Sequence, residues 1–175
     1  MRKKTMDELN RPSVEAFREQ ARKPVALVLD NVRSGLNVGS VFRTADGFGL
    51  ERILLCGITA IPPHREILKT ALGATESVSW SHYLDPVAAV LELKNEGYKV
   101  LAVEQAVGSI QLHEFRVLPG RQYALVFGNE VNGVSDEVMA HVDGALEIPQ
   151  AGAKHSLNIS VCAGILAWEF ARQMG

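Results

Sequence analysis

The sequence lacks long apolar runs and contains few cysteines. Within its 175 residues, no stretch approaches the roughly 20 consecutive apolar residues that a membrane-spanning helix needs. The charged first 23 residues have no apolar centre of the kind found in a secretory signal peptide. The two cysteines, Cys56 and Cys162, lie in apolar runs, where buried free thiols are expected rather than a disulfide. We therefore expect a soluble protein of a reducing compartment, the cytoplasm, with no membrane contact.

A strong net charge is also absent. The formal net charge is −2, which on its own does not indicate a nucleic-acid-binding protein. The distribution is uneven, because residues 1–23 carry a net charge of +3 and residues 24–175 carry −5. We expect a basic helical arm at 1–23, able to contact phosphates, followed by one domain at 24–175. A solvated amphipathic helix accounts equally well for the arm, so charge neither supports nor excludes an RNA partner.

Several motifs of well-known enzyme classes are missing. Gly35 and Gly39, after the first expected strand, have the wrong spacing for a dinucleotide-binding G-x-G-x-x-G. The segment GAKHS at 152–156 is only a fragment of a P-loop, and no G-x-S-x-G elbow is present. The five histidines show no ligand spacing with either cysteine, so we expect no metal site. Nucleotide oxidoreductases, NTPases, metalloenzymes and hydrolases therefore lose support.

Short apolar runs alternate with helix-like segments along the chain. This alternation is typical of an α/β domain with a mainly parallel sheet and flanking helices. No internal repeat or linker interrupts it, so a single domain fits the length. The sequence predicts strands at 25–29, 52–55, 100–103, 123–127 and 145–148, with a weaker one at 78–80. It predicts helices at 6–21, 38–48, 65–72, 86–96, 136–140 and 157–173.

Glycine, asparagine and serine cluster directly after three of the expected strands. The segments are DNVRSGLNVGS at 30–40, GNEVNGVS at 128–135 and PQAGAKHSLN at 149–158. In open α/β sheets, ligands bind at the carboxyl ends of the strands. Such residues also form ordinary turns. Three such loops, each with amide or charged residues beside its glycine, favour a ligand site over turns alone.

The same three regions resemble motifs 1, 2 and 3 of the SpoU/TrmH methyltransferases, a branch of the SPOUT superfamily. The matching segments are DNVRSGLNVGSVFRTADGFGL at 30–50, LVFGNEVNGVS at 125–135 and LEIPQAGAKHSLNISVCAGILAWE at 146–169. Their order and spacing also fit, and the resemblance covers about residues 24–170. It implies an α/β fold with a C-terminal trefoil knot and a homodimer. It also implies transfer of a methyl group from S-adenosylmethionine to a ribose 2′-hydroxyl of RNA.

In motif 1, Asn37 and Arg43 are the candidate catalytic residues. Asn37 precedes an apolar-periodic stretch and is a good N-cap candidate. Arg43 lies among apolar residues, where a buried guanidinium needs an anionic partner. That partner is either a structural carboxylate or a substrate, and the resemblance favours the substrate because Arg43 matches the family's essential arginine. Since arginine has a pKa above about 12, we expect it to orient the ribose or stabilise its alkoxide rather than act as a base.

Motifs 2 and 3 supply the other candidate catalytic residues. Gly128 is expected to let a ligand approach the backbone closely. The resemblance gives Glu130 a supporting role at the catalytic centre, and a helix cap or loop brace is an equally good explanation. Ser156 is predicted as the N-cap of the last helix, with Asn158 in its first turn. The resemblance places both beside Arg43 in the active site.

The resemblance also implies binding residues. It implies that main-chain groups hold most of the cofactor, at Gln105, Phe127, Gly128, Ile148, Gln150, Ser156 and Leu157. Arg33, Arg65 and Lys69 are expected RNA contacts, unless they are ordinary surface charges. Because the chain has no room for an added RNA-binding domain, tRNA is favoured over ribosomal RNA. A non-catalytic RNA-binding module and a small-molecule methyltransferase are the alternatives from other classes.

Overall fold

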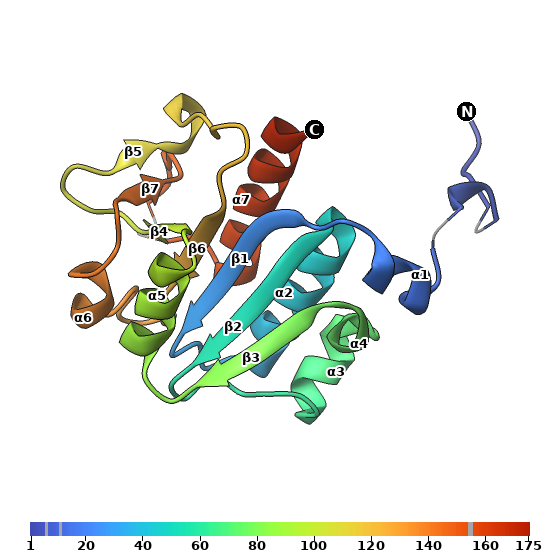
Figure 1. Cartoon of the computed structure of the whole chain (residues 1–175), viewed down its shortest axis with the longest axis horizontal. Coiled ribbons are helices and arrows are strands. Elements are labelled where there is room, and N and C mark those ends of the chain that lie inside the picture. Colours follow the sequence, from blue (N-terminus) through green and yellow to red (C-terminus); the bar gives the residue numbers. More distant parts are fainter. Residues whose placement is uncertain (6, 11, 154–155) are drawn as a thin grey trace.

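A seven-stranded sheet forms the centre of the protein, in the order β3-β2-β1-β6-β4-β7-β5 (Figure 1). The computed structural model describes residues 1–175 apart from positions 6, 11, 154 and 155. Every pair of neighbouring strands is parallel, which confirms the predicted α/β class with a mainly parallel sheet. The strands are β1 (Lys23–Asp30), β2 (Leu50–Cys56), β3 (Ser79–Tyr83), β4 (Lys99–Val103), β5 (Ile110–Gln111), β6 (Tyr123–Phe127) and β7 (Ala145–Glu147).

The sheet is buried on both faces at its centre. Strand β1 pairs with β2 and β6, so that Leu27 lies opposite Ile53 on one side and Leu125 on the other. Side chains alternate between the faces along a strand. Leu27 therefore packs in the core on one face, whereas its neighbours Ala26 and Val28 pack on the other. This explains why the central strands are continuous apolar runs, as expected of a parallel sheet covered by helices.

Helices cover both faces of the sheet (Figure 1). One face carries α2 and α7, with α3 and α4 packed against α2, and the other carries α5 and α6. The elements are α2 (Gly35–Phe48), α3 (Arg65–Ala71), α4 (Ala74–Ser77), α5 (Pro86–Asn95), α6 (Asp136–Met139), α7 (Ile159–Met174) and the 3-10 turn η2 (Leu112–Glu114). Each predicted helix from residue 38 onward has a counterpart among them. The two-residue strand β5 and the short α4 were not predicted.

The predicted N-terminal helix over 6–21 is wrong as a single element. The described residues form a 3-10 turn, η1 (Asp7–Leu9), and a separate helix, α1 (Val14–Glu19). Asn10 between them has φ of 45°, and Pro12 has no N–H to donate, so a continuous helix does not pass through this point. Positions 6 and 11 lie outside the described residues.

Two predicted helix caps are displaced by a few residues. Ser34, rather than Asn37, caps α2, because its side chain accepts the Asn37 N–H at 3.2 Å. Asn158, rather than Ser156, caps α7, and its Oδ1 accepts the Ser160 N–H at 2.8 Å. Both sequences offer two suitable cap residues close together, so composition alone does not choose between them. The shift leaves the Asn37 side chain available for contacts outside its own helix.

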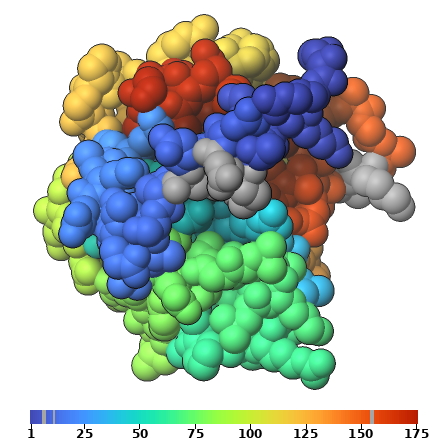
Figure 2. Space-filling model, turned by 90° about the vertical axis from the view of Figure 1, so that its right-hand side faces the viewer, coloured from blue at the N-terminus to red at the C-terminus, as the bar shows by residue number. Residues whose placement is uncertain are grey.

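The N-terminal arm uses two of its cations to hold other parts of the protein. Helix α1 lies against α4 (Figure 2). Arg18 Nε donates to the carbonyl of Glu76 at 2.8 Å, and Arg22 Nη2 donates to that of Ser77 at 3.0 Å. These carbonyls belong to the last residues of α4, where helix carbonyls need partners from outside the helix. Arg18 and Arg22 thus have a structural role that their charge alone did not indicate.

None of the helices among the described residues is both long enough and apolar enough to cross a membrane.

Candidate functional site

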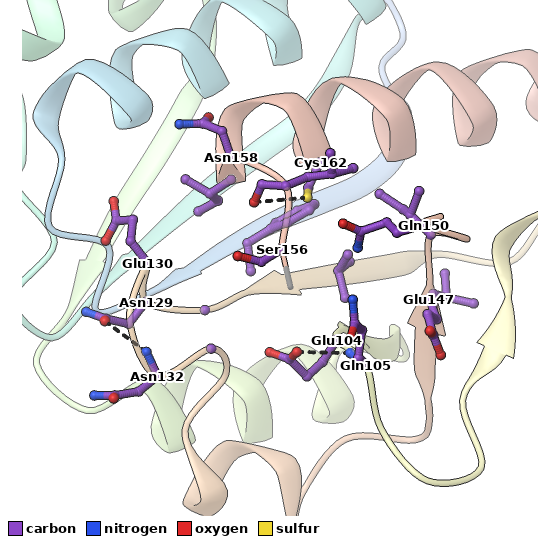
Figure 3. A pocket seen from close by; sticks show the side chains of 18 of the residues that line it. Glu104, Gln105, Asn129, Glu130, Asn132, Glu147, Gln150, Ser156, Asn158 and Cys162 are labelled. Carbon is purple, nitrogen blue, oxygen red and sulfur yellow. Dashed lines mark hydrogen bonds between the residues drawn. The ribbon is translucent and has the colours of Figure 1, made fainter. Parts of the chain in front are cut away.

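A cavity of about 570 Å³ opens at the carboxyl ends of β4, β6 and β7, beside the start of α7 (Figure 3). The parallel topology brings these loops together, because all the strands end at the same edge of the sheet. The volume is in the range of small-molecule sites. All seven predicted cofactor residues line it: Gln105, Phe127, Gly128, Ile148, Gln150, Ser156 and Leu157.

Hydrogen bonds connect the three motifs beside this cavity. The Glu130 carboxylate accepts the backbone N–H groups of Arg33 at 3.0 Å and Ser34 at 3.1 Å, and the Asn37 side-chain amide at 3.2 Å. The Asn158 amide in turn donates to Asn37 Oδ1 at 3.2 Å. Glu130 therefore braces the start of α2, which is the loop-bracing alternative considered for it. Three of the five candidate catalytic residues form one connected chain.

The environment of Glu130 keeps its carboxyl ionised. Partial burial raises its pKa, but the hydrogen bonds from Arg33, Ser34 and Asn37, together with its own backbone N–H, outweigh burial and hold the pKa below its ordinary value. Hydrogen bonds to the charged form of a carboxylate stabilise that form. The carboxylate thus remains an acceptor for motif 1 across neutral pH.

The loop at 128–135 is held tightly by its own backbone and by β1. Asn129 and Gly133 exchange two backbone hydrogen bonds of 2.9 Å. A side chain on Gly128 would lie 1.9 Å from the Gly133 carbonyl carbon, so glycine is required here by the close approach of the loop itself. At the far end, the buried Asp30 accepts the backbone N–H and the hydroxyl of Ser135 at 2.8 and 2.7 Å. The cavity wall formed by this loop is therefore rigidly placed.

Arg43 lies apart from the other candidates. Its side chain is exposed on α2, it does not line the cavity, and it makes no hydrogen bond or ion pair with the described residues. The expectation that it is buried among apolar residues is wrong, because the apolar neighbours Val41, Phe42 and Ala45 face the core while Arg43 faces solvent. Ser156 lines the cavity, so the structure gathers Asn37, Glu130, Ser156 and Asn158 but not Arg43.

The three candidate RNA contacts are exposed. Arg33 precedes α2, and Arg65 and Lys69 lie on α3, which packs directly against α2. The packing is close at Gly39, where a side chain would lie 2.3 Å from the Ile67 carbonyl. The guanidinium of Arg33 is free to face solvent because only its backbone N–H binds Glu130. Arg33 thus lies just before α2, and Arg65 and Lys69 lie on the helix packed against α2.

Glu104 and Glu147 also line the cavity, and sequence reasoning did not select them. Glu104 follows β4 directly, so the rule that polar residues at strand ends form ligand sites would have found it. Glu147 is the last residue of β7, within a run that resembles an ordinary strand. Among the residues described, there is no group of three or more His, Cys, Asp or Glu side chains that could hold a metal ion.

Comparisons with known proteins agree on one family. A tRNA (guanosine(18)-2′-O)-methyltransferase of Aquifex aeolicus is 31% identical over 161 residues, 89% of this chain and 72% of that protein. A relative in Bacillus subtilis, named as a TrmH family tRNA/rRNA methyltransferase, is 30% identical over 160 residues, 91% of this chain and 63% of that protein. The crystal structure of an AdoMet-bound rRNA methyltransferase from Sinorhizobium meliloti matches with a TM-score of 0.80 and 27% identity, over 89% of this chain and 59% of that one.

The last two of these proteins are considerably longer than the chain described here, which spans 63% and 59% of their lengths. The family described as the SpoU rRNA Methylase family matches residues 24–168, which include motifs 1 and 2, motif 3 as far as Trp168, and every described residue that lines the cavity. The chain belongs to the SpoU rRNA Methylase family.

Proposed function

We propose that this protein is an S-adenosylmethionine-dependent RNA methyltransferase that modifies a ribose 2′-hydroxyl, with residues 24–175 carrying the activity. The observation that carries the proposal is the cavity at the strand ends. Hydrogen bonds through Glu130, Asn37 and Asn158 connect this cavity to motif 1. Membership of the family supports it, since one relative is named as a tRNA 2′-O-methyltransferase and one matching structure is AdoMet-bound.

The volume and the lining residues of the cavity suit the cofactor. Phe127, Ile148 and Leu157 offer apolar surface for an adenine ring, and the loops expose backbone groups for its polar edges. Three glutamates and no lysine or arginine are among the described lining residues, which suits a positively charged sulfonium. When bound, the cofactor supplies an electrophilic methyl group. Its proposed contacts are Gln105, Phe127, Gly128, Ile148, Gln150, Ser156 and Leu157.

The protein's proposed contribution to methyl transfer is alignment and charge stabilisation. The ribose hydroxyl loses its proton as its oxygen bonds to the methyl carbon, so the site must stabilise developing negative charge. Asn37, Ser156 and Asn158 supply polar groups beside the cavity, and Glu130 holds Asn37 in place. Arg43, whose guanidinium is free of protein partners among the described residues, would grip the substrate phosphate or alkoxide.

We propose that two copies of the chain associate through α7. Val161 and Trp168 on this helix are 49% and 57% exposed, and Leu157 just before it is 37% exposed. With Ile165 between them, the spacing places these residues on one side of the helix. An exposed apolar stripe of this kind marks an interaction surface. A second copy covering it would also offer a route for Arg43 to reach a cavity other than its own.

The proposed RNA is tRNA, with ribosomal RNA as the second candidate. The Aquifex relative named for tRNA is covered over 72% of its length, a larger share than the 59% of the matching rRNA methyltransferase structure. Arg33, Arg65 and Lys69 are the proposed contacts to phosphates, because all three are exposed cations, just before α2 or on the helix that packs against it.

Two further features belong to the same proposal. We propose that the C-terminal segment forms a trefoil knot. In support, β7 lies beyond β4 on one side of β6, whereas α7 packs on α2 and β1 on the other, so the chain crosses the end of β6.

We also propose a cytoplasmic location, which the two free cysteines support.

The test is transfer of labelled methyl groups from S-adenosylmethionine to fractionated cellular RNA, followed by mapping of the modified nucleotide. We expect label at one ribose position in the tRNA fraction. Label in ribosomal RNA alone would replace tRNA with the second candidate. Cofactor binding without labelling of any RNA would refute the enzymatic assignment.

A further inference from the structure

Glu104 places a carboxylate in the cavity wall opposite α7. Its Oε1 accepts the Gln105 N–H at 2.9 Å, and its Oε2 accepts the Val134 N–H at 3.1 Å. A side chain on Gly133 would lie 2.2 Å from Glu104 Oε2, so the loop at 128–135 approaches the carboxylate as closely as glycine allows. Glu104 is half-buried, and both oxygens are fixed by backbone donors. Its position is therefore well determined.

No cation among the described residues neutralises this carboxylate. Glu104 makes no salt bridge there, and the described lining of the cavity contains no lysine or arginine. The negative charge of Glu104 also affects a side chain on the opposite wall of the cavity. Burial raises the pKa of the Cys162 thiol on α7, and the negative charge of Glu104 raises it further. Figure 3 shows Glu104 and Cys162 on opposite sides of the cavity, with Ser156 between them.

The other two glutamates of the cavity differ from Glu104. Glu130 is occupied by three donors from motif 1 and braces α2. Glu147 accepts the Ser109 hydroxyl at 2.7 Å, at the edge formed by β5 and β7. Among the described residues, Glu104 binds only two backbone N–H groups beside it and lies across the cavity from Cys162 of the facing helix. A carboxylate with no cationic partner among the described residues acts strongly in a partly enclosed cavity, because less water screens it there than at an open surface.

We propose that Glu104 is a specificity-determining residue that makes the cavity bind S-adenosylmethionine in preference to its product S-adenosylhomocysteine. This inference rests on the proposed function. The two ligands differ by one methyl group and one positive charge on sulfur. In the transfer, the S–CH₃ bond breaks and its electron pair stays on sulfur, the O–CH₃ bond forms, and the hydroxyl proton leaves to solvent. The attraction to Glu104 is therefore lost with the methyl group, which favours exchange of product for fresh cofactor.

A purely structural role for Glu104 predicts a different result. If the carboxylate only holds Val134 and the loop, its loss weakens both ligands by the same factor. If its charge selects the ligand, its loss changes the ratio of the two dissociation constants. Glu104→Gln removes the charge while keeping the size and one acceptor oxygen. Glu19→Gln is the matched control, because Glu19 is exposed on α1 and does not line the cavity.

The experiment is calorimetric titration of the full chain and both variants with each ligand. We expect the preference for S-adenosylmethionine to fall by about fivefold or more in Glu104→Gln and to stay unchanged in Glu19→Gln. Binding of sinefungin is a measurement that needs no variant. This analogue carries an ammonium group on carbon where S-adenosylmethionine has the methylsulfonium, so it keeps the positive charge. The unmodified protein should bind it more tightly than S-adenosylhomocysteine.

An unchanged ratio in Glu104→Gln, or sinefungin binding no tighter than the product, overturns the inference while leaving the proposed function intact. Failure of the unmodified protein to bind S-adenosylmethionine overturns both.

Discussion

The side-chain amide of Asn158 donates a hydrogen bond to Asn37 Oδ1, 3.2 Å away, although 121 residues separate the two in sequence. Asn158 also caps α7 through its Oδ1, which accepts the Ser160 N–H and hydroxyl. One side chain thus fixes the start of a helix with one atom and connects motif 3 to motif 1 with the other. The geometry of the candidate site therefore depends on the cap.

Replacing Asn158 by Ala should lower both stability and activity. The loss of an N-cap costs about 1 kcal/mol of unfolding free energy, and loss of the bond to Asn37 frees that side chain. We expect a fall of about that size in urea unfolding, with methyl transfer reduced much further. Ser13→Ala removes the cap of α1, which lies outside the cavity, and is the control. Equal loss of activity in both variants would contradict a role for the Asn158–Asn37 contact.

Glu130 should make stability depend on pH in the acid range. Its hydrogen bonds hold the pKa in the folded protein below the ordinary value of 4.5. The folded state therefore binds the proton less readily than the unfolded state, and the stabilisation is present above about pH 4.5 and lost as pH falls through the lower folded pKa. Comparing urea unfolding of the unmodified protein and Glu130→Gln between pH 3 and 7 should show a difference that shrinks on acidification. If the difference in unfolding free energy grows on acidification, the folded state raises the pKa of Glu130 instead of lowering it.

Two glycines offer a matched test of why glycine is needed in motif 2. A Cβ on Gly128 would lie 1.9 Å from the backbone of Gly133, whereas one on Gly47, in α2, would have nothing within 4 Å. Gly128→Ala should therefore destabilise by about 1–3 kcal/mol through overpacking and weaken cofactor binding. Gly47→Ala should stabilise by about 0.5–1 kcal/mol, since alanine favours a helix. Thermal unfolding with and without S-adenosylmethionine measures both, and similar behaviour of the two variants would be inconsistent with the described loop.

The buried central strands were predictable because each is a short apolar run, whereas the two-residue β5 has no such run. The loops at the strand ends were predictable from glycine and asparagine. Helix caps were less so. Ser34 and Asn37, or Ser156 and Asn158, are all good cap residues, and tertiary contacts decide which one is used. The exposure of Arg43 was not predictable from its apolar neighbours, because its helix turns them to the core and Arg43 to solvent. Tertiary packing decides which face of the helix is turned to the core, and the local sequence alone does not show it.

Arg43→Ala should abolish methyl transfer while leaving the fold and cofactor affinity intact. Because Arg43 is exposed and makes no hydrogen bond or ion pair with the described residues, its removal should change unfolding free energy by less than about 0.5 kcal/mol. Activity should fall by about a hundredfold or more, as expected when a group that stabilises developing charge is lost. Arg43→Lys should recover little, because an ammonium group lacks the planar fork. Arg121→Ala, at another exposed position outside the cavity, is the control. Normal turnover in Arg43→Ala would exclude it from the mechanism.

A charge placed on the exposed face of α7 should separate the proposed dimer. Trp168 is 57% exposed and touches Phe48 with ring centroids 6.0 Å apart, so its outer side is available to a second copy. Trp168→Glu would place a carboxylate in that apolar interface, where burying an unpaired charge is costly. Light scattering should give the mass of two chains for the unmodified protein and of one for the variant. Leu84→Glu, at a residue that is 86% exposed and lies between β3 and α5, should leave the mass unchanged. If Trp168→Glu keeps the mass of two chains, the copies associate through another surface, and Arg43 must reach its substrate by a route that does not involve α7.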